Sequence, residues 1–164
     1  GSEMCIRDSP SPGNKAGGIT TLEEKSLGCI HKGGHTPVME VYDYAKQVEP
    51  KKGLVIMDTP GNDPSSVAAM VAGGAQVVVF STGRGTPTGN PIAPVIKITG
   101  NRITFANMED NIDVDASPLF YGGDLGEMGD ALLKLVAEVA SGKQTKAESL
   151  GFTEMAIARV CNFV

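Results

Sequence analysis

The chain has 164 residues, which is enough for one domain with a buried core. Hydrophobic residues make up 41% and charged residues 20%, so a globular fold is expected rather than a disordered chain. A net charge of −5 and an aromatic content of 5% argue against nucleic acid as a partner. No apolar run approaches the roughly 20 residues of a membrane span. The three scattered cysteines form no disulfide framework, so we expect a cytoplasmic protein.

Residues 1–9, GSEMCIRDS, are interpreted as a non-native leader. Gly1-Ser2 resembles a cloning scar, and Met4 to Asp8 match the translation of a sequencing-library adapter. We therefore assign no function to Cys5 and expect the native domain over residues 10–164, as the C-terminal piece of a longer gene product.

Two helices and one strand are predicted in the first part of the native domain. Residues 20–34 begin with Thr21 and Glu24 at capping-box spacing and end at a glycine pair. Residues 36–48 have apolar side chains at helical spacing, which predicts a second helix. Residues 53–58, GLVIMD, are a short apolar run typical of a buried strand.

The rest of the chain is expected to contain further helices and strands. Asp63 is the predicted N-cap of an alanine-rich helix that begins with Pro64 and ends at residue 74. Residues 124–142 have apolar side chains along one stripe and predict the longest helix. The other predictions are strands at 76–80, 93–99 and 154–160, a strand or hairpin partner at 101–107, and a helical turn at 146–150.

The order strand, helix, strand, loop, strand over residues 53–99 predicts an α/β fold. We expect a single domain with a Rossmann-like, mostly parallel sheet covered by helices. In such sheets ligands bind outside the carboxyl ends of the strands. Two unusual loops follow strands there, TPGND (59–63) and STGRGTP (81–87), and they face each other if their strands are neighbours.

Each of these two loops has a possible ligand-binding role and an alternative, structural one. The first precedes a helix N-terminus, which favours an anion, but Asp63 as N-cap would occupy the same N–H groups. A capped helix after a turn is therefore the alternative. In the second loop Arg84 lies between two glycines, and its planar guanidinium fits a carboxylate or phosphate. Its partner is either a ligand or a buried acidic side chain. The absence of Walker A and GxGxxG sequences argues against a nucleotide.

Cys29, His31 and His35 have the spacing C-x-H-x₃-H, which raises the question of a metal site. Residues two apart do not share a helical face, so a buried cysteine with exposed histidines is the favoured interpretation. The acidic residues of a later segment lack the spacing of a calcium loop and are predicted to lie in loops and turns: Asp110, Asp113 and Asp115.

Several motifs together resemble the altronate dehydratase and galactarate dehydratase family of sugar-acid hydro-lyases. They are PSPGNKAGGITTLEEKSLGCIHKGG, TPGND and FSTGRGTPTG, followed near the end by ASGKQTKAE and GFTEMAIAR. The resemblance covers residues 10–164 and implies the C-terminal domain only, with an N-terminal domain and a middle region missing. It implies dehydration of altronate or galactarate to a 2-keto-3-deoxy acid, with a divalent metal, commonly Fe²⁺, whose ligands lie outside this chain. His31 and His35 depart from the family pattern.

The chemistry of this reaction suggests roles for particular side chains. Removal of the proton next to a carboxylate requires a base, and the enediolate must be stabilised. If the chain carries out this reaction, as the resemblance implies, we expect Arg84, Thr82 and Thr86 to hold the carboxylate of the substrate. Asn62 and Asp63 are expected to bind sugar hydroxyls. The candidate acid–base or positioning groups are Lys25, Lys32 and Glu24.

Two alternatives remain open. The domain is a non-catalytic scaffold or dimerisation module of such an enzyme, or it belongs to a related lyase such as the large subunit of a sulfolactate sulfo-lyase. The expected partners are a small sugar acid, the missing upstream domains or a separate subunit, and a second copy of the chain. Neither nucleic acid nor a membrane is expected.

Overall fold

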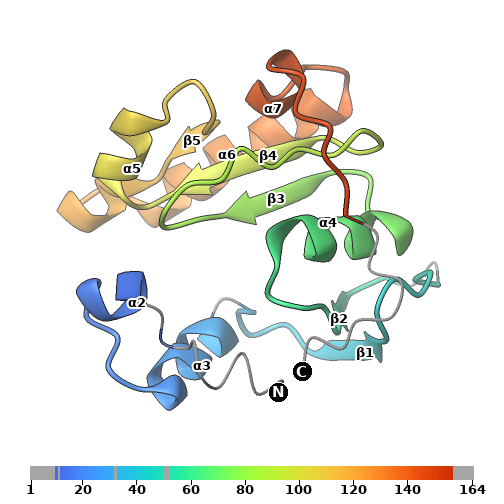
Figure 1. Ribbon diagram of the computed structural model, residues 1–164, viewed down its shortest axis with the longest axis horizontal. Coiled ribbons are helices and arrows are strands. Elements are labelled where there is room, and N and C mark those ends of the chain that lie inside the picture. The colour runs from blue at the N-terminus through green and yellow to red at the C-terminus, as the bar shows by residue number, and fades with distance from the viewer. Residues whose placement is uncertain (1–9, 11, 32, 50–51, 157–164) are drawn as a thin grey trace.

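The computed structural model describes residues 10, 12–31, 33–49 and 52–156, and of Cys29 only the backbone (Figure 1). The leader assigned to residues 1–9, the candidate Lys32 and the last four residues of the strand predicted at 154–160 lie outside the described residues. The elements in chain order are α2 (Pro12–Ala16), α3 (Leu22–His31), β1 (Val38–Tyr42), β2 (Leu54–Met57), α4 (Asp63–Ala72), β3 (Val78–Ser81), β4 (Val95–Thr99), α5 (Arg102–Asn107), β5 (Val114–Asp115), η1 (Ser117–Tyr121), α6 (Leu125–Ala140) and α7 (Lys146–Ser149).

The described strands form two parallel sheets. One sheet has two strands, β1 and β2, and the other has three strands in the order β3-β4-β5. The α/β class and the parallel pairing are confirmed. A Rossmann-like sheet is not confirmed, because β2 and β3 belong to different sheets. The strands that precede the TPGND and STGRGTP loops are therefore not hydrogen-bonded neighbours, which was the condition for the two loops to face each other.

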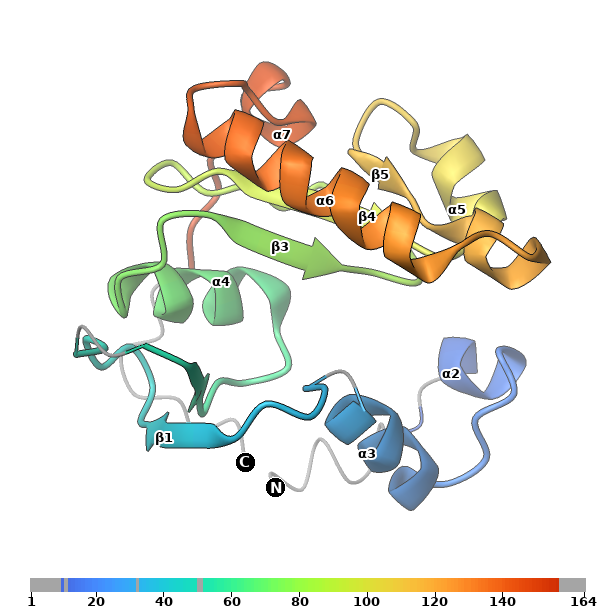
Figure 2. The ribbon, with the colours of Figure 1, turned by 180° about the vertical axis from the view of Figure 1, so that it is seen from behind.

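Helices separate and cover these sheets. Helix α4 lies between the β1–β2 sheet and strand β3, and α6 runs across the three-stranded sheet on its far side (Figures 1 and 2). The buried core joins Val67 of α4 to Val78 of β3 and Val95 of β4. Partly buried apolar side chains surround these three: Met70, Val71, Ala75 and Phe80. None of the described helices is long and apolar enough to cross a membrane.

Most predicted helices are present, with shifted ends. The side chain of Asp124 caps α6 by accepting a hydrogen bond from the backbone N–H of Glu127 at 2.8 Å. Helix α4 begins one residue earlier than predicted, because the N-cap is Asn62 rather than Asp63. A full capping box between Thr145 and Glu148 starts α7.

Three predicted elements are wrong or incomplete. Residues 36–48 do not form a helix, since Val38–Tyr42 is strand β1 and pairs with β2. Residues 102–107 form helix α5 rather than the predicted strand, because the side chain of the N-cap Asn101 accepts hydrogen bonds from two N–H groups of the first turn. Residues 154–156 of the predicted last strand form no strand. Asp115, which was predicted to lie in a loop or turn, belongs to the short strand β5.

Candidate functional site

The STGRGTP loop is held in one shape on both sides of Arg84. The hydroxyl of Thr82 accepts a hydrogen bond from the backbone N–H of Gly85 at 3.0 Å. The carbonyl oxygen of Gly83 accepts one from the Thr104 hydroxyl at 2.8 Å and one from the Asn101 side-chain amide at 3.3 Å. Gly85 has a φ of +86°, a conformation that favours glycine. The backbone that presents Arg84 is therefore fixed by the start of α5.

The guanidinium of Arg84 is exposed on this fixed loop. Its side chain lies against Gly13 of α2, with Cδ 3.1 Å and Nε 3.4 Å from the position that a Cβ of residue 13 would occupy. Within the described part of the chain, no hydrogen bond or ion pair engages the guanidinium. An exposed cation on a rigid backbone is suited to bind an anion from solution, since little side-chain and loop order has to be gained on binding.

The two threonines predicted beside Arg84 have structural partners. Thr86 is buried, and its hydroxyl lies 2.7 Å from that of Thr88. Thr82 is half-buried and caps the turn, as described above. Both side chains stabilise the loop in this structure, and their predicted contact with substrate stays a prediction.

The TPGND loop has the geometry of a capped helix. The Oδ1 atom of Asn62 accepts hydrogen bonds from the backbone N–H of Ser65 at 3.3 Å and from its hydroxyl at 3.1 Å. Thr59 and Ser66 join their hydroxyls at 2.9 Å across the turn. Because Asn62 already occupies an N–H group that an anion would need, the loop fits the alternative of a capped helix after a turn. Asp63, predicted to bind sugar hydroxyls, is the half-buried first residue of α4.

Two of the candidate acid–base residues, Glu24 and Lys25, lie on α3. The carboxylate of Glu24 is exposed and accepts hydrogen bonds from the backbone N–H of Thr20 at 2.8 Å and from its hydroxyl at 2.9 Å. These two hydrogen bonds lower the pKa of Glu24, so this carboxyl is ionised and engaged in capping the helix. Lys25 is half-buried. The geometry assigns no proton transfer to either residue.

Lys97, which was not among the predicted site residues, is a fully buried lysine in contact with the STGRGTP segment. Its side chain is 0% exposed, and its Nζ donates a hydrogen bond to the carbonyl oxygen of Pro87 at 3.2 Å. The same Nζ atom lies 5.8 Å from the centroid of the Phe152 ring. Burial lowers the pKa of Lys97. The available signal was a lysine inside the aliphatic run VIKIT. The buried Lys97 therefore stabilises the end of the STGRGTP loop through its hydrogen bond to Pro87.

The described residues give no fitting metal site. No group of three or more His, Cys, Asp or Glu side chains that could hold a metal ion is found among them. His31 and His35 are exposed, and the side chain of Cys29 is not among those described. The expected metal therefore has no set of ligands within this part of the chain.

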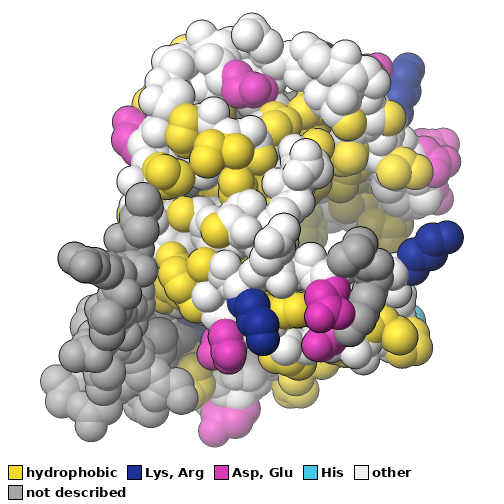
Figure 3. Space-filling model, turned by 90° about the vertical axis from the view of Figure 1, so that its right-hand side faces the viewer, with side chains coloured by type: hydrophobic (Ala, Val, Ile, Leu, Met, Phe, Trp, Pro, Cys, Tyr) yellow, Lys and Arg dark blue, Asp and Glu magenta, His cyan; other side chains and the backbone are white. Residues whose placement is uncertain are grey.

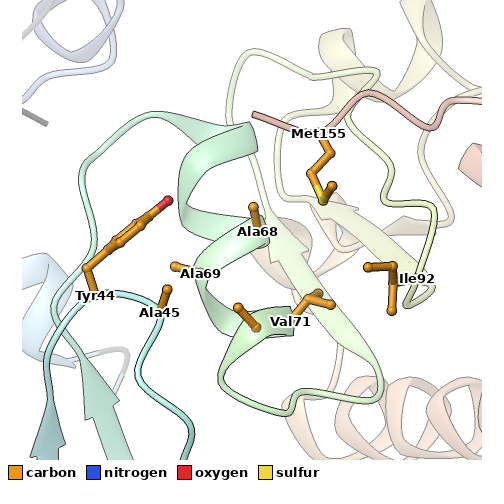
Figure 4. Close-up of a pocket in the computed structure, with 8 residues that line it drawn as sticks. Tyr44, Ala45, Ala68, Ala69, Val71, Ile92 and Met155 are labelled. Carbon is orange, nitrogen blue, oxygen red and sulfur yellow. The ribbon is translucent and has the colours of Figure 1, made fainter. Parts of the chain in front are cut away.

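An apolar hollow of about 340 Å³ lies on another part of the molecule (Figure 4). It is lined by alanines of α4 together with Tyr44, Ile92 and Met155. The Tyr44 hydroxyl donates to the carbonyl oxygen of Ser65 at 3.0 Å. Seen from the right-hand side of Figure 1, hydrophobic side chains reach the surface in several places with few charged ones between them (Figure 3). The hollow has no charged lining side chain, so it does not fit a sugar acid.

Comparison with known proteins assigns a family to most of the chain. Residues 2–162 match the family model described as D-galactarate/altronate dehydratase, C-terminal. The chain is 43% identical over 155 residues to altronate dehydratase of Escherichia coli, which covers 94% of this chain and 31% of that protein. It is 40% identical to (2R)-sulfolactate sulfo-lyase subunit beta of Chromohalobacter salexigens, with 92% and 39% covered, and 40% identical to galactarate dehydratase (L-threo-forming) of Escherichia coli, with 82% and 26% covered. The chain thus spans well under half the length of these relatives.

Proposed function

Because the chain belongs to the D-galactarate/altronate dehydratase C-terminal family, we propose that it is the C-terminal part of a sugar-acid hydro-lyase. The substrate is an acid of the altronate or galactarate type, and the product is a 2-keto-3-deoxy acid. Similarity to altronate dehydratase along 94% of the chain supports this proposal. The single structural observation that supports it is the exposed guanidinium of Arg84 on a loop whose backbone is fixed on both sides.

Arg84 is proposed to bind the carboxylate of the substrate. Its guanidinium can donate two parallel hydrogen bonds to the two carboxylate oxygens. When the proton on the neighbouring carbon leaves, negative charge accumulates on these same oxygens as the enediolate forms. The cation is then attracted more strongly to the transition state than to the substrate, which lowers the barrier. A base takes the proton, and an acid assists departure of the β-hydroxyl as water.

The remaining site assignments are part of the same proposal. Lys25, Lys32 and Glu24 stay candidates for positioning or acid–base roles. Asn62 and Asp63 stay candidates for contact with sugar hydroxyls. A divalent metal, Fe²⁺, is proposed to be bound by residues outside the described part of this chain. A cytoplasmic location is proposed as well.

A second candidate is a lyase that expels sulfite from sulfolactate. The 40% identity to a sulfolactate sulfo-lyase subunit favours it. Both types of substrate have a carboxylate, so carboxylate binding by Arg84 fits both and the leaving group distinguishes them. The third candidate, a scaffold, predicts that the loop does not affect turnover.

The test is a substrate profile of the assembled enzyme that contains this domain. Altronate, galactarate and sulfolactate are supplied with Fe²⁺ under anaerobic conditions, and the 2-keto-3-deoxy acid and sulfite are measured. Formation of the keto acid supports the hydro-lyase, and release of sulfite alone supports the second candidate. If all three substrates are unchanged, the lyase proposal is wrong.

A further inference from the structure

The two-stranded sheet β1–β2 has two different faces. Its parallel register pairs Val41 with Ile56 and Tyr42 with Met57. Because successive side chains of a strand point to opposite faces, these two pairs lie on opposite sides of the sheet. The sheet therefore has a Tyr42 face and a Val41 face.

The Tyr42 face is covered by α4. Tyr42 is 4% exposed, and the Met57 side chain lies against Gly73 at the C-terminal end of that helix. Figures 1 and 2 show α4 between this sheet and strand β3. This side of the sheet is part of the interior.

The Val41 face is open and aliphatic. Val41 is 66% exposed, Val38 is 47% exposed and Ile56 is 46% exposed. Leu54 is two residues before Ile56 on β2 and therefore lies on the same side of the sheet. Val38 pairs with Leu54, because the register shifts between Val38 and Glu40. A hollow of about 480 Å³, lined by Val38, Leu54, Ile56 and also Ile30 at the end of α3, lies beside this face.

The β1–β2 sheet is covered on its Tyr42 face but lacks a packed layer on its Val41 face. Parallel sheets occur almost only with both faces covered, and a sheet of two strands is marginal without a packed layer. A contiguous cluster of aliphatic side chains at the surface marks an interaction site. The Val41 face therefore requires a second apolar layer, which no described segment of this chain supplies.

We propose that the Val41 face, made of Val38, Val41, Leu54 and Ile56, is the docking surface for the N-terminal remainder of the dehydratase polypeptide. The family model is that of a C-terminal domain, and the chain spans only 31% of the altronate dehydratases that it matches. More than two thirds of each such enzyme is thus available to cover it. The Val41 face has no charged member, so the docking segment is an apolar helix or strand surface. The inference rests on family membership and not on the proposed chemistry.

Binding in trans tests this proposal. The chain is mixed with the N-terminal remainder of the Escherichia coli altronate dehydratase and, separately, with that of the Bacillus subtilis enzyme. Complex formation is measured by light scattering and calorimetry. The variant Val41→Arg places a charge on the Val41 face, and Leu133→Arg on α6 is the matched control, because both parent side chains are 66% exposed. The melting temperature of each variant reports on folding.

The proposal predicts a one-to-one complex with at least one remainder. Val41→Arg weakens it by about tenfold or more, because a charge without a partner must be buried in the interface. Leu133→Arg leaves the affinity within about twofold, as expected outside the interface. Three results would overturn the proposal: no complex with either remainder, equal losses for both variants, or a homodimer of this chain that Val41→Arg dissociates. Because the readout is binding, a failure here is distinguishable from a lack of dehydratase activity.

Discussion

The side chain of Arg84 packs over Gly13, so that two segments 71 residues apart in the chain meet at the candidate site. Its Cδ lies 3.1 Å from the position that a Cβ of residue 13 would occupy. A larger residue at position 13 therefore displaces the guanidinium. We expect Gly13→Val to weaken altronate binding by about 3- to 10-fold, the cost of losing part of a charged hydrogen bond.

The control for this variant is Gly18→Val, because no atom lies within 4 Å of a Cβ at Gly18, although its φ of +101° adds local strain. Calorimetry gives the affinities and thermal unfolding gives the stabilities. If Gly13→Val binds altronate as tightly as the unmodified chain, the contact with Arg84 is not part of the site.

The buried Lys97 is predicted to make the free energy of unfolding depend on pH in the alkaline range. Burial lowers its pKa below the usual value of 10.5, so between these two values the unfolded chain binds more protons than the folded one. Stability conferred by this group consequently increases as the pH rises through that window. We expect the unmodified chain to gain stability relative to Lys97→Met as the pH rises through the lowered pKa toward 10.5.

Urea unfolding at several pH values measures this difference. Lys134→Met, on α6, removes an exposed lysine and is the control. A constant difference between the unmodified chain and Lys97→Met over this range would show that Lys97 keeps its usual pKa in the folded protein.

Asn62 is predicted to stabilise α4 more than it contributes to binding. Its Oδ1 atom caps the N–H group of Ser65, so Asn62→Ala should lower the free energy of unfolding by about 1 kcal/mol. Asn62→Ser should retain most of the stability because serine is an equivalent cap. Urea unfolding checks both variants. Equal losses for alanine and serine would exclude the capping role.

Glu24 predicts an acid-sensitive start of α3. Hydrogen bonds from Thr20 lower its pKa below 4.5, so the stabilisation is complete above that value and is lost as the pH falls through the lowered pKa. We expect helical circular dichroism to decrease in this window, and Glu24→Gln to reduce the acid-dependent change. Glu23→Gln removes the neighbouring carboxylate as a control. The same acid transition in Glu24→Gln as in the unmodified chain would contradict this role.

The sequence predicts elements whose signals are local. Asp124 and the apolar stripe after it identify α6, and the short aliphatic runs identify β2, β3 and β4. Residues 36–48 mislead because their apolar spacing fits a helix as well as a strand, and pairing with β2 decides between the two. In α5 the Asn101 cap overrides the strand preference of the residues that follow.

The candidate site, like the fold, was predictable from the sequence only where its signals are local. Arg84 between two glycines is a local signal, and its exposure agrees with the predicted anion-binding role. Its contact with Gly13 and the support from Lys97 depend on tertiary packing, which one sequence does not display. The separation of β2 from β3 into two sheets is likewise a property of the whole fold, and the sequence order alone suggested one sheet.

Calorimetric titration of altronate and galactarate into this chain, its Arg84→Ala variant and its Arg102→Ala variant tests the central claim most directly. Arg102 is an exposed arginine on α5 and serves as the matched control. The account predicts saturable binding that Arg84→Ala weakens by about 10- to 100-fold, the range expected when hydrogen bonds to a charged group are lost. Arg102→Ala should bind as the unmodified chain does. Equal affinity of Arg84→Ala and the unmodified chain would contradict the assignment of the carboxylate site to this loop.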